Sequence, residues 1–174
     1  MSEDCNRGPL HDERTTYVHH GGSLSLPNTS LIVIIRDVLA RDLRFRFAAP
    51  GFSMSPFIRD GDVITLVSYT AASCLSGDVV AFVRPGTNRL VVHRVVGMSR
   101  DGCRIRGDNT PEDDGEIPHE CIIGKVTRVE RAGKTVRFGL GPERRIIAIF
   151  SRRRWLPFCI GAAGKVCSVV RRLK

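Results

Sequence analysis

Between residues 62 and 139 the sequence is a succession of short apolar segments separated by turn-forming residues. Each segment is rich in Val, Ile or Phe and is bounded by Gly, Pro, Asn or Asp. The segments span residues 62–68, 77–83, 89–98, 103–107, 122–131 and 134–139. β-Branched and aromatic residues suit the half-buried surface of a sheet, and the bounding residues favour turns. This spacing therefore predicts a mainly β fold built on a coiled, antiparallel sheet.

The chain divides into three parts around this region. Its 174 residues, of which 42% are hydrophobic, suit one domain with its own core and two tails. We expect a disordered polar arm at 1–28, a folded domain at 29–140, and a basic, partly apolar extension at 141–174.

A helix is expected at the start of the folded domain. Thr29 or Ser30 can cap it, because short hydroxyl side chains accept hydrogen bonds from the first free backbone N–H groups. The apolar residues that follow share one helical face: they are Leu31, Ile35, Val38 and Leu39. The alternating stretch 44–47 then indicates a half-buried strand.

Positive charge is concentrated at the C-terminal end of the chain. Residues 128–174 contain 13 Lys and Arg against 2 Asp and Glu, whereas the whole chain has a net charge of +9. Such a basic tail is typical of proteins that contact anionic lipid or nucleic acid, or it simply keeps a surface solvated. No helix-turn-helix, zinc-finger or RNA-binding signature accompanies it. We therefore favour an anionic membrane surface or a solvated tail over a nucleic-acid partner.

The sequence contains no clear transmembrane helix. A spanning helix needs about 20 predominantly apolar residues, but the stretch 31–40 is interrupted by Arg36 and Asp37, and 155–170 contains proline, glycine and lysine. The N-terminus is polar and acidic and lacks the apolar centre of a secretory signal. These features predict a cytoplasmic protein or one that is peripheral on the inner membrane, with the C-terminal apolar run at the lipid boundary.

The six cysteines show no metal-binding spacing. No two of them form a Cys-x-x-Cys pair, and no histidine lies at zinc-finger distance from them. They are Cys5, Cys74, Cys103, Cys121, Cys159 and Cys167. We interpret them as reduced thiols, buried or free, in preference to disulfides.

The stretch APGFSMSPFIRDGD, residues 49–62, places Ser53 between Gly51 and Pro56. Taken alone, this is the composition of a turn. A nucleophilic serine needs a base within hydrogen-bond reach, commonly a histidine with an unperturbed pKa of about 6.5, and an acid that orients the ring. The sequence offers His93 and a group of acids near residue 110, but their spacing alone does not show that they meet.

Three blocks, taken in order, carry a family resemblance. They are GFSMSPFIRDGD (51–62), GDVVAF…RLVVHRVVG (77–97) and RGDNTPEDD…IIGKV (106–126). Together they resemble the signal peptidase I superfamily, which includes the LexA-type self-cleaving proteins, over about half the chain. The resemblance implies a signal peptidase/LexA-like sheet fold with an N-terminal helix and no metal or cofactor. It also implies a serine endopeptidase that cleaves a precursor or leader peptide through an acyl-enzyme.

The second block identifies the general base that the resemblance implies. Most bacterial members use a lysine, whereas the branch typified by endoplasmic-reticulum, archaeal and sporulation-type signal peptidases uses a histidine. His93 stands in this block, and none of the four lysines lies there. A lysine must lose about 3 pKa units before it acts near neutral pH, whereas a histidine needs little tuning. The resemblance therefore assigns Ser53 as nucleophile and His93 as base.

The third block offers more than one acid to orient the histidine. By its place in the block, Asp114 matches the family's acid, and it is our prediction for the catalytic acid. Asp108 is the alternative, although its position after a glycine equally suits a turn or a buried hydrogen-bonding role, and Asp113 is a third candidate. Asp62 and Asp78, in two Gly-Asp pairs, are expected to hold turns through backbone hydrogen bonds.

One position departs from the family's pattern. Signal peptidases commonly carry a serine two residues before the nucleophile, where its hydroxyl helps to bind the oxyanion, and here that residue is Gly51. The backbone at Ser53 and Gly51 then forms the candidate oxyanion site, with the Ser53 N–H nearly alone. Because loss of one oxyanion donor costs about 10²–10³ in rate, we expect a slow enzyme.

Two other functions stay open at this point. A LexA-like regulator would cleave itself or only bind, but it would usually carry a DNA-binding helix-turn-helix ahead of the peptidase domain, for which residues 1–28 are short and polar. The other is a catalytically dead adaptor on a membrane surface, and Gly51 is the residue that favours it. The sequence does not define the oligomeric state.

Overall fold

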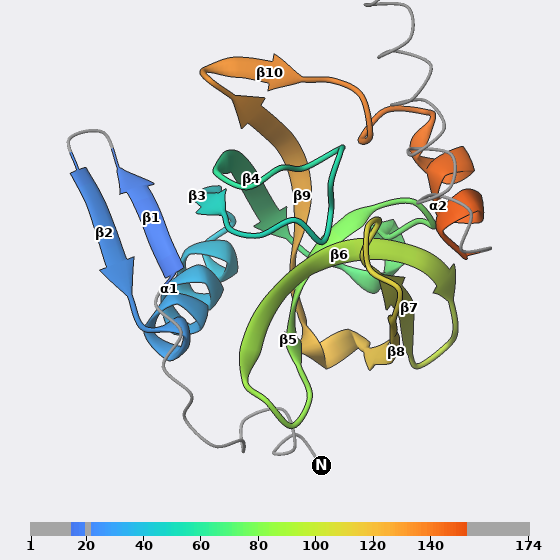
Figure 1. Cartoon of the computed structure of the whole chain (residues 1–174). Coiled ribbons are helices and arrows are strands. Elements are labelled where there is room, and N and C mark those ends of the chain that lie inside the picture. The colour runs from blue at the N-terminus through green and yellow to red at the C-terminus, as the bar shows by residue number, and fades with distance from the viewer. Residues whose placement is uncertain (1–14, 20–21, 153–174) are drawn as a thin grey trace, which may run out of the picture.

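The computed structural model describes residues 15–19 and 22–152, and these form a mainly β fold (Figure 1). One curled antiparallel sheet dominates, with the strand order β3-β4-β9-β5-β6-β7-β8, and β10 pairs with β9 beside this path. Its strands are β3 (Phe45–Ala49), β4 (Asp62–Ser68), β5 (Val79–Arg84), β6 (Arg89–Met98), β7 (Gly102–Arg106), β8 (Asp113–Pro118), β9 (Ile122–Arg131) and β10 (Lys134–Val136). Two α-helices accompany the sheet: α1 (Asn28–Ala40) and α2 (Arg144–Arg152). The predicted coiled, antiparallel β fold with an N-terminal helix is confirmed.

Strand β5 lies between two hydrophobic cores. Its side chains alternate between the two faces of the sheet, and both faces are covered, so five consecutive residues are buried. Val79, Ala81 and Val83 pack in the core that includes α1, which we call the first core. Val80 and Phe82 pack in the second core, which is formed with β6, β7 and β8.

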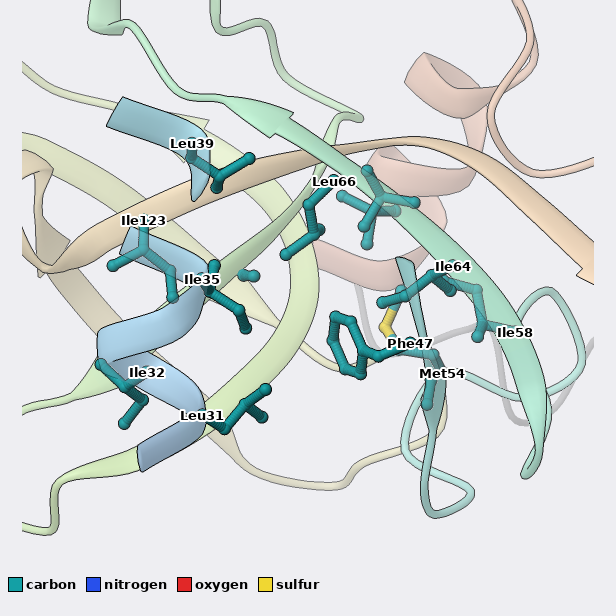
Figure 2. Packing of buried hydrophobic residues seen from close by; sticks show 14 of the residues in the cluster. Leu31, Ile32, Ile35, Leu39, Phe47, Met54, Ile58, Ile64, Leu66 and Ile123 are labelled. Atoms are coloured by element: carbon teal, nitrogen blue, oxygen red, sulfur yellow. The ribbon is translucent and has the colours of Figure 1, made fainter. Parts of the chain in front are cut away.

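Helix α1 closes the first core (Figure 2). Its buried residues are Leu31, Ile32, Ile35 and Leu39, whose spacing places them on one helical face. Figure 2 shows them lying toward Phe47, Leu66 and Ile123 of the sheet. A fully buried Leu or Ile contributes about 1.5–3 kcal/mol to stability. Most of the predicted face is therefore correct, but Ile32 is buried where Val38 is only half-buried.

The helix cap lies two or three residues earlier than expected, at Pro27 instead of Thr29 or Ser30, and the expected side-chain cap is absent. Asn28 is the first helical residue, Pro27 occupies the N-cap position, and no side-chain capping hydrogen bond forms there. The Pro27 carbonyl accepts a hydrogen bond from Leu31 N at 3.1 Å. Proline cannot donate from its backbone nitrogen, so it suits a position just outside the first turn.

A two-stranded antiparallel hairpin lies within the predicted polar arm. It comprises β1 (Thr15–His19) and β2 (Gly22–Leu26), beside α1 and β3 (Figure 1). The sequence analysis did not anticipate it. At the other end, α2 occupies the start of the predicted basic extension, and the rest of that extension, 153–174, lies outside the described residues. None of the helices in the described part of the chain is long and apolar enough to cross a membrane.

Candidate active site

Ser53 lies in a well-anchored loop between β3 and β4. Met54 and Ile58 are buried in the first core, and Ile58 N donates to Met54 O at 3.0 Å. Gly51 N donates to the Asp60 carboxylate at 2.7 Å. Figure 2 shows Met54 and Ile58 pointing into the core beside the sheet. Met54 and Ile58 anchor the loop on the C-terminal side of Ser53. Ser53 itself is partly exposed at the surface of the loop.

His93 and Asp114 meet in a buried hydrogen bond. His93 Nδ1 lies 2.5 Å from Asp114 Oδ2, and their side chains are only 6% and 4% exposed. The register between β7 and β8 shifts so that Gly115 pairs with Ile105 and Asp113 with Arg106, which leaves Asp114 as the extra residue of a β-bulge. A bulge re-aims the side chain that it carries. Asp114 is thereby placed to reach His93 of β6, two strands away in the sheet.

Asp114 is held as a carboxylate by two partners. Its other oxygen, Oδ1, accepts a hydrogen bond from the Arg84 guanidinium at the end of β5. Burial raises the pKa of Asp114, but the interactions with His93 and Arg84 outweigh burial, so the pKa lies below its ordinary value. An ionised Asp114 can only accept, so His93 Nδ1 must donate the shared proton. In a neutral ring, His93 Nε2 then carries the lone pair.

Asp108 binds Arg94 and not His93. Arg94 follows His93 on β6, so its side chain points to the opposite face of the strand. There Arg94 binds Asp108 through Nε and Nη2 at 2.7–3.1 Å, and both side chains are fully buried. Arg94 Nη1 also donates to two backbone carbonyls, those of Gly77 and Gly139. This ion pair joins three segments of the fold and leaves Asp114 as the acid bonded to His93.

The third acidic candidate also points elsewhere. Asp113 binds Arg104 at 2.9 Å and accepts a hydrogen bond from Gly115 N, and its surroundings are exposed. The two Gly-Asp aspartates hold turns as predicted. Asp62 accepts from Arg59 N at 2.8 Å, and Asp78 accepts from Leu75 N at 3.0 Å.

A turn after β7 connects the histidine to the serine loop. Asn109 N donates to the Ser53 carbonyl at 2.7 Å, and Asn109 Nδ2 donates to the Phe52 carbonyl at 3.2 Å. Gly107 lies where this turn comes closest to both His93 and the Ser53 loop. A Cβ on Gly107 would be 2.9 Å from both His93 Nε2 and the Ser53 carbonyl oxygen. His93 Nε2 is therefore directed at the segment that carries Ser53.

Ser53 and His93 line the same cavity, which has a volume of about 340 Å³. Among the described residues, no hydrogen bond joins Ser53 Oγ to the imidazole. Such bonds are often long in unliganded sites and tighten when substrate binds. Apolar residues of β3 and β6, among them Phe47, Leu90 and Val92, form much of the wall, and Arg84 contributes charge.

The cavity lies between two strand edges. β3 is the terminal strand at one end of the sheet. On β6, residues 89–93 pair with β5, whereas pairing with β7 starts only at Arg94. Within the described part of the chain, the first half of β6 thus has one strand neighbour, and its Leu90 N donates to the Asn28 side chain at 3.4 Å. An extended peptide would fit between these edges.

The backbone at Gly51 is not available to an oxyanion. Its N–H is donated to Asp60, and its φ of 92° is a conformation that favours glycine. By contrast, no hydrogen bond in the described part of the chain engages the backbone N–H of Ser53. Of the predicted oxyanion site, only the backbone N–H of Ser53 is available. The positive φ at position 51 favours glycine over the serine of the family's pattern.

Lys125, the lysine within the third block, binds residues outside the candidate site. Its Nζ lies 2.9 Å from the Asp78 carboxylate and donates to the Ser73 carbonyl at 3.3 Å. Over the described residues, no three His, Cys, Asp or Glu side chains are grouped as metal ligands.

The sequence analysis missed Arg84, Gly107 and Thr110 as parts of this site. Arg84 ends an apolar segment and carries no motif of its own. Gly107 and Thr110 belong to the third block, and the glycine before Asp108 was the one available signal. No protein-family model matches the sequence, and no significant match is found among curated proteins.

Proposed function

We propose that this protein is a serine endopeptidase of the signal-peptidase type that cleaves a precursor or leader peptide. The observation that carries the proposal is the buried His93–Asp114 pair, whose free Nε2 is directed at the Ser53 loop. A buried acid that fixes one ring nitrogen leaves the other to act as a base, which is the arrangement a serine nucleophile requires.

The chemistry follows from these three side chains. Ser53 Oγ attacks the peptide carbonyl carbon while its proton passes to His93 Nε2. Asp114 stabilises the imidazolium that forms, and His93 then returns the proton to the leaving amine. Water hydrolyses the acyl-enzyme in a second round with the same base. The Ser53 N–H is the backbone donor for the oxyanion, and with one such donor we expect slow turnover.

The substrate would lie as an extended strand between β3 and the first half of β6. Its backbone would pair with these edges, and the Asn28 side chain on Leu90 N would give way to a substrate carbonyl. Because Phe47, Leu90 and Val92 line the cavity, apolar side chains are the ones that fit near the scissile bond.

Association with an anionic membrane surface remains part of the proposal. Helix α2 leaves Ile146 and Ile149 more than half exposed, three residues apart on one face, and Arg145 is exposed next to them. Pelleting with anionic vesicles at low salt that is lost at high salt, and lost on truncation after Ser151, would support this. A full-length protein that stays in the supernatant at every salt concentration contradicts it.

A synthetic peptide library tests the peptidase itself. We expect the wild-type protein to cleave a subset of the library, with the cut sites read by mass spectrometry. Ser53→Ala and His93→Ala should be inactive but folded, whereas Lys125→Ala should retain activity. Cleavage that persists in Ser53→Ala, or that is lost only in Lys125→Ala, would refute the assignment.

A further inference from the structure

A second cluster of reactive side chains lies away from Ser53, His93 and Asp114. It contains Tyr69 and Cys74 from the connection between β4 and β5, Cys103 of β7, and His119 from the turn before β9. Cys103 is fully buried on β7, and Cys74 is 3% exposed on the turn between β4 and β5. Both sulfurs belong to the second core, and both are free thiols. Cys121 of the same core is disulfide-bonded instead, so the expectation of reduced thiols is wrong for that cysteine.

The hydrogen bonds converge on one sulfur atom. Tyr69 Oη lies 3.6 Å from Cys103 Sγ and 2.7 Å from His119 Nδ1. His119 Nδ1 is itself 4.0 Å from Cys103 Sγ, and the Tyr69 and His119 rings stack at 6.0 Å. Hydrogen bonds from a phenol and an imidazole stabilise a sulfur as the thiolate. An ordinary core cysteine lacks such partners and stays an inert thiol.

The two cysteines are electrostatically unequal. The neighbouring Cys74 thiol lowers the pKa of Cys103 to about 6, helped by Tyr69 and His119 against the opposing effect of burial. In return, Cys103 and burial raise the pKa of Cys74. One thiolate beside one protonated thiol is the combination in which the first sulfur reacts and the second resolves the product.

The turn that carries Cys74 offers a route for a small oxidant. In residues 70–76 only the Cys74 side chain is buried. Several hydrogen bonds of this turn are local, such as Cys74 N to Ala71 O at 3.3 Å and Ser73 N to Thr70 O at 3.1 Å. Exposed segments with local hydrogen bonds open at low free-energy cost. Opening this turn would move Cys74, which neighbours Cys103, without unfolding the sheet.

We propose that Cys103 and Cys74 form a peroxide-oxidisable pair that closes to an intrachain disulfide. The Cys103 thiolate attacks a peroxide oxygen, so an S–O bond forms, the O–O bond breaks, and hydroxide leaves and takes up a proton. Cys103 is then a sulfenic acid. Cys74 loses its proton and attacks the Cys103 sulfur, so the S–S bond forms, the S–O bond breaks, and water leaves. Two thiols and one peroxide thus give one disulfide and two waters.

The test uses the full-length reduced protein and hydrogen peroxide. We expect proteolytic mapping to link the Cys74 peptide to the Cys103 peptide by a disulfide. Cys74→Ser should stop the reaction at the sulfenic acid, which dimedone traps on Cys103. Tyr69→Phe keeps the ring but removes the hydroxyl, so oxidation near pH 6 should be at least about threefold slower.

The same protein unfolded in urea is the reference, because there the cysteines should react without preference. The proposal is overturned if Cys103 in the folded protein reacts no faster than in urea. It is equally overturned if oxidised Cys103 pairs with a different cysteine, or proceeds to sulfinic acid while Cys74 stays a thiol. These outcomes do not depend on peptidase activity, so this inference stands or falls separately from the proposed function.

Discussion

Replacing Gly107 with alanine places a methyl group between the parts of the candidate active site. The added Cβ would lie 2.6 Å from Thr110 Oγ1 and 2.9 Å from both His93 Nε2 and the Ser53 carbonyl oxygen. Carbon contacts below 3.0 Å force a neighbour to shift. The Thr110 hydroxyl can rotate away, but the other two neighbours are fixed.

The loss of activity and stability in Gly107→Ala depends on how firmly the Ser53 carbonyl and the His93 ring are held. The Ser53 carbonyl is backbone and holds a 2.7 Å hydrogen bond from Asn109 N, and the His93 ring is buried on Asp114. Overpacking of this kind costs about 1–3 kcal/mol of stability. A catalytic group displaced by about 1 Å costs about 10²-fold in rate. We therefore expect Gly107→Ala to stay folded with a loss of about 1–3 kcal/mol in stability, and to turn over about 10²-fold more slowly.

Gly97→Ala is the matched control on strand β6. Its Cβ would meet only Arg104 Cβ at 3.5 Å, an ordinary contact. Turnover is measured on a peptide selected from the library, and the free energy of unfolding is measured by urea denaturation. If Gly107→Ala turns over like Gly97→Ala, then His93 and the Ser53 loop do not need their observed spacing, and the reasoning is refuted.

Further variants separate the acids and their partners. Asp114→Asn should lower turnover by up to about 10⁴-fold with little loss of fold. Asp108→Asn should cost about 3–5 kcal/mol of stability by leaving Arg94 unpaired. The reverse pattern in kinetics and urea unfolding would make Asp108 the catalytic acid and Asp114 the structural one. Arg84→Ala should lower turnover, while Arg104→Ala, which breaks the exposed pair with Asp113, should not; equal rates would leave Arg84 without a role. The folded-state pKa of Asp114 lies below its unfolded value of about 3.9, so its stabilising contribution is complete above that pH and is lost on acidification. Urea unfolding should therefore show the stability gap between wild type and Asp114→Asn shrinking from about pH 5 to about pH 2, and a constant gap would contradict the assignment.

Three strands were located from the sequence with the bounds that the structure has. The segments 62–68, 89–98 and 122–131 coincide with β4, β6 and β9. Strand β8 was missed because its sequence, DDGEIP, is acidic and contains glycine and proline, so it looks like a turn. What makes it a strand is the pairing with β7, which is a tertiary effect that local propensity does not encode.

The candidate site was predictable only in part. The resemblance nominated Ser53, His93 and Asp114, but choosing Asp114 over Asp108 on physical grounds requires the bulge in β8 and the opposite faces of His93 and Arg94. Both features depend on strand register, which a single sequence does not reveal. The same holds for Arg84 and Gly107, whose partners are distant in the chain.

The hairpin within residues 15–26 was missed for a similar reason. Its sequence is largely polar, and the short alternation of Leu24 and Leu26 with serine was not taken as a strand. The helix cap was misplaced by two or three residues because the sequence alone favours the hydroxyl residues Thr29 and Ser30 as caps.

Covalent labelling with a fluorophosphonate tests the central claim most directly, because such a probe reacts with a serine that a base has activated. We predict a single labelled residue, Ser53, identified by peptide mass spectrometry. Labelling should be abolished in Ser53→Ala, should fall strongly in His93→Ala, and should persist in Ser55→Ala, which changes the other serine of the same loop. Labelling of Ser55 instead, or labelling of Ser53 at the wild-type rate in His93→Ala, would contradict the claim that Ser53 is a nucleophile activated by His93.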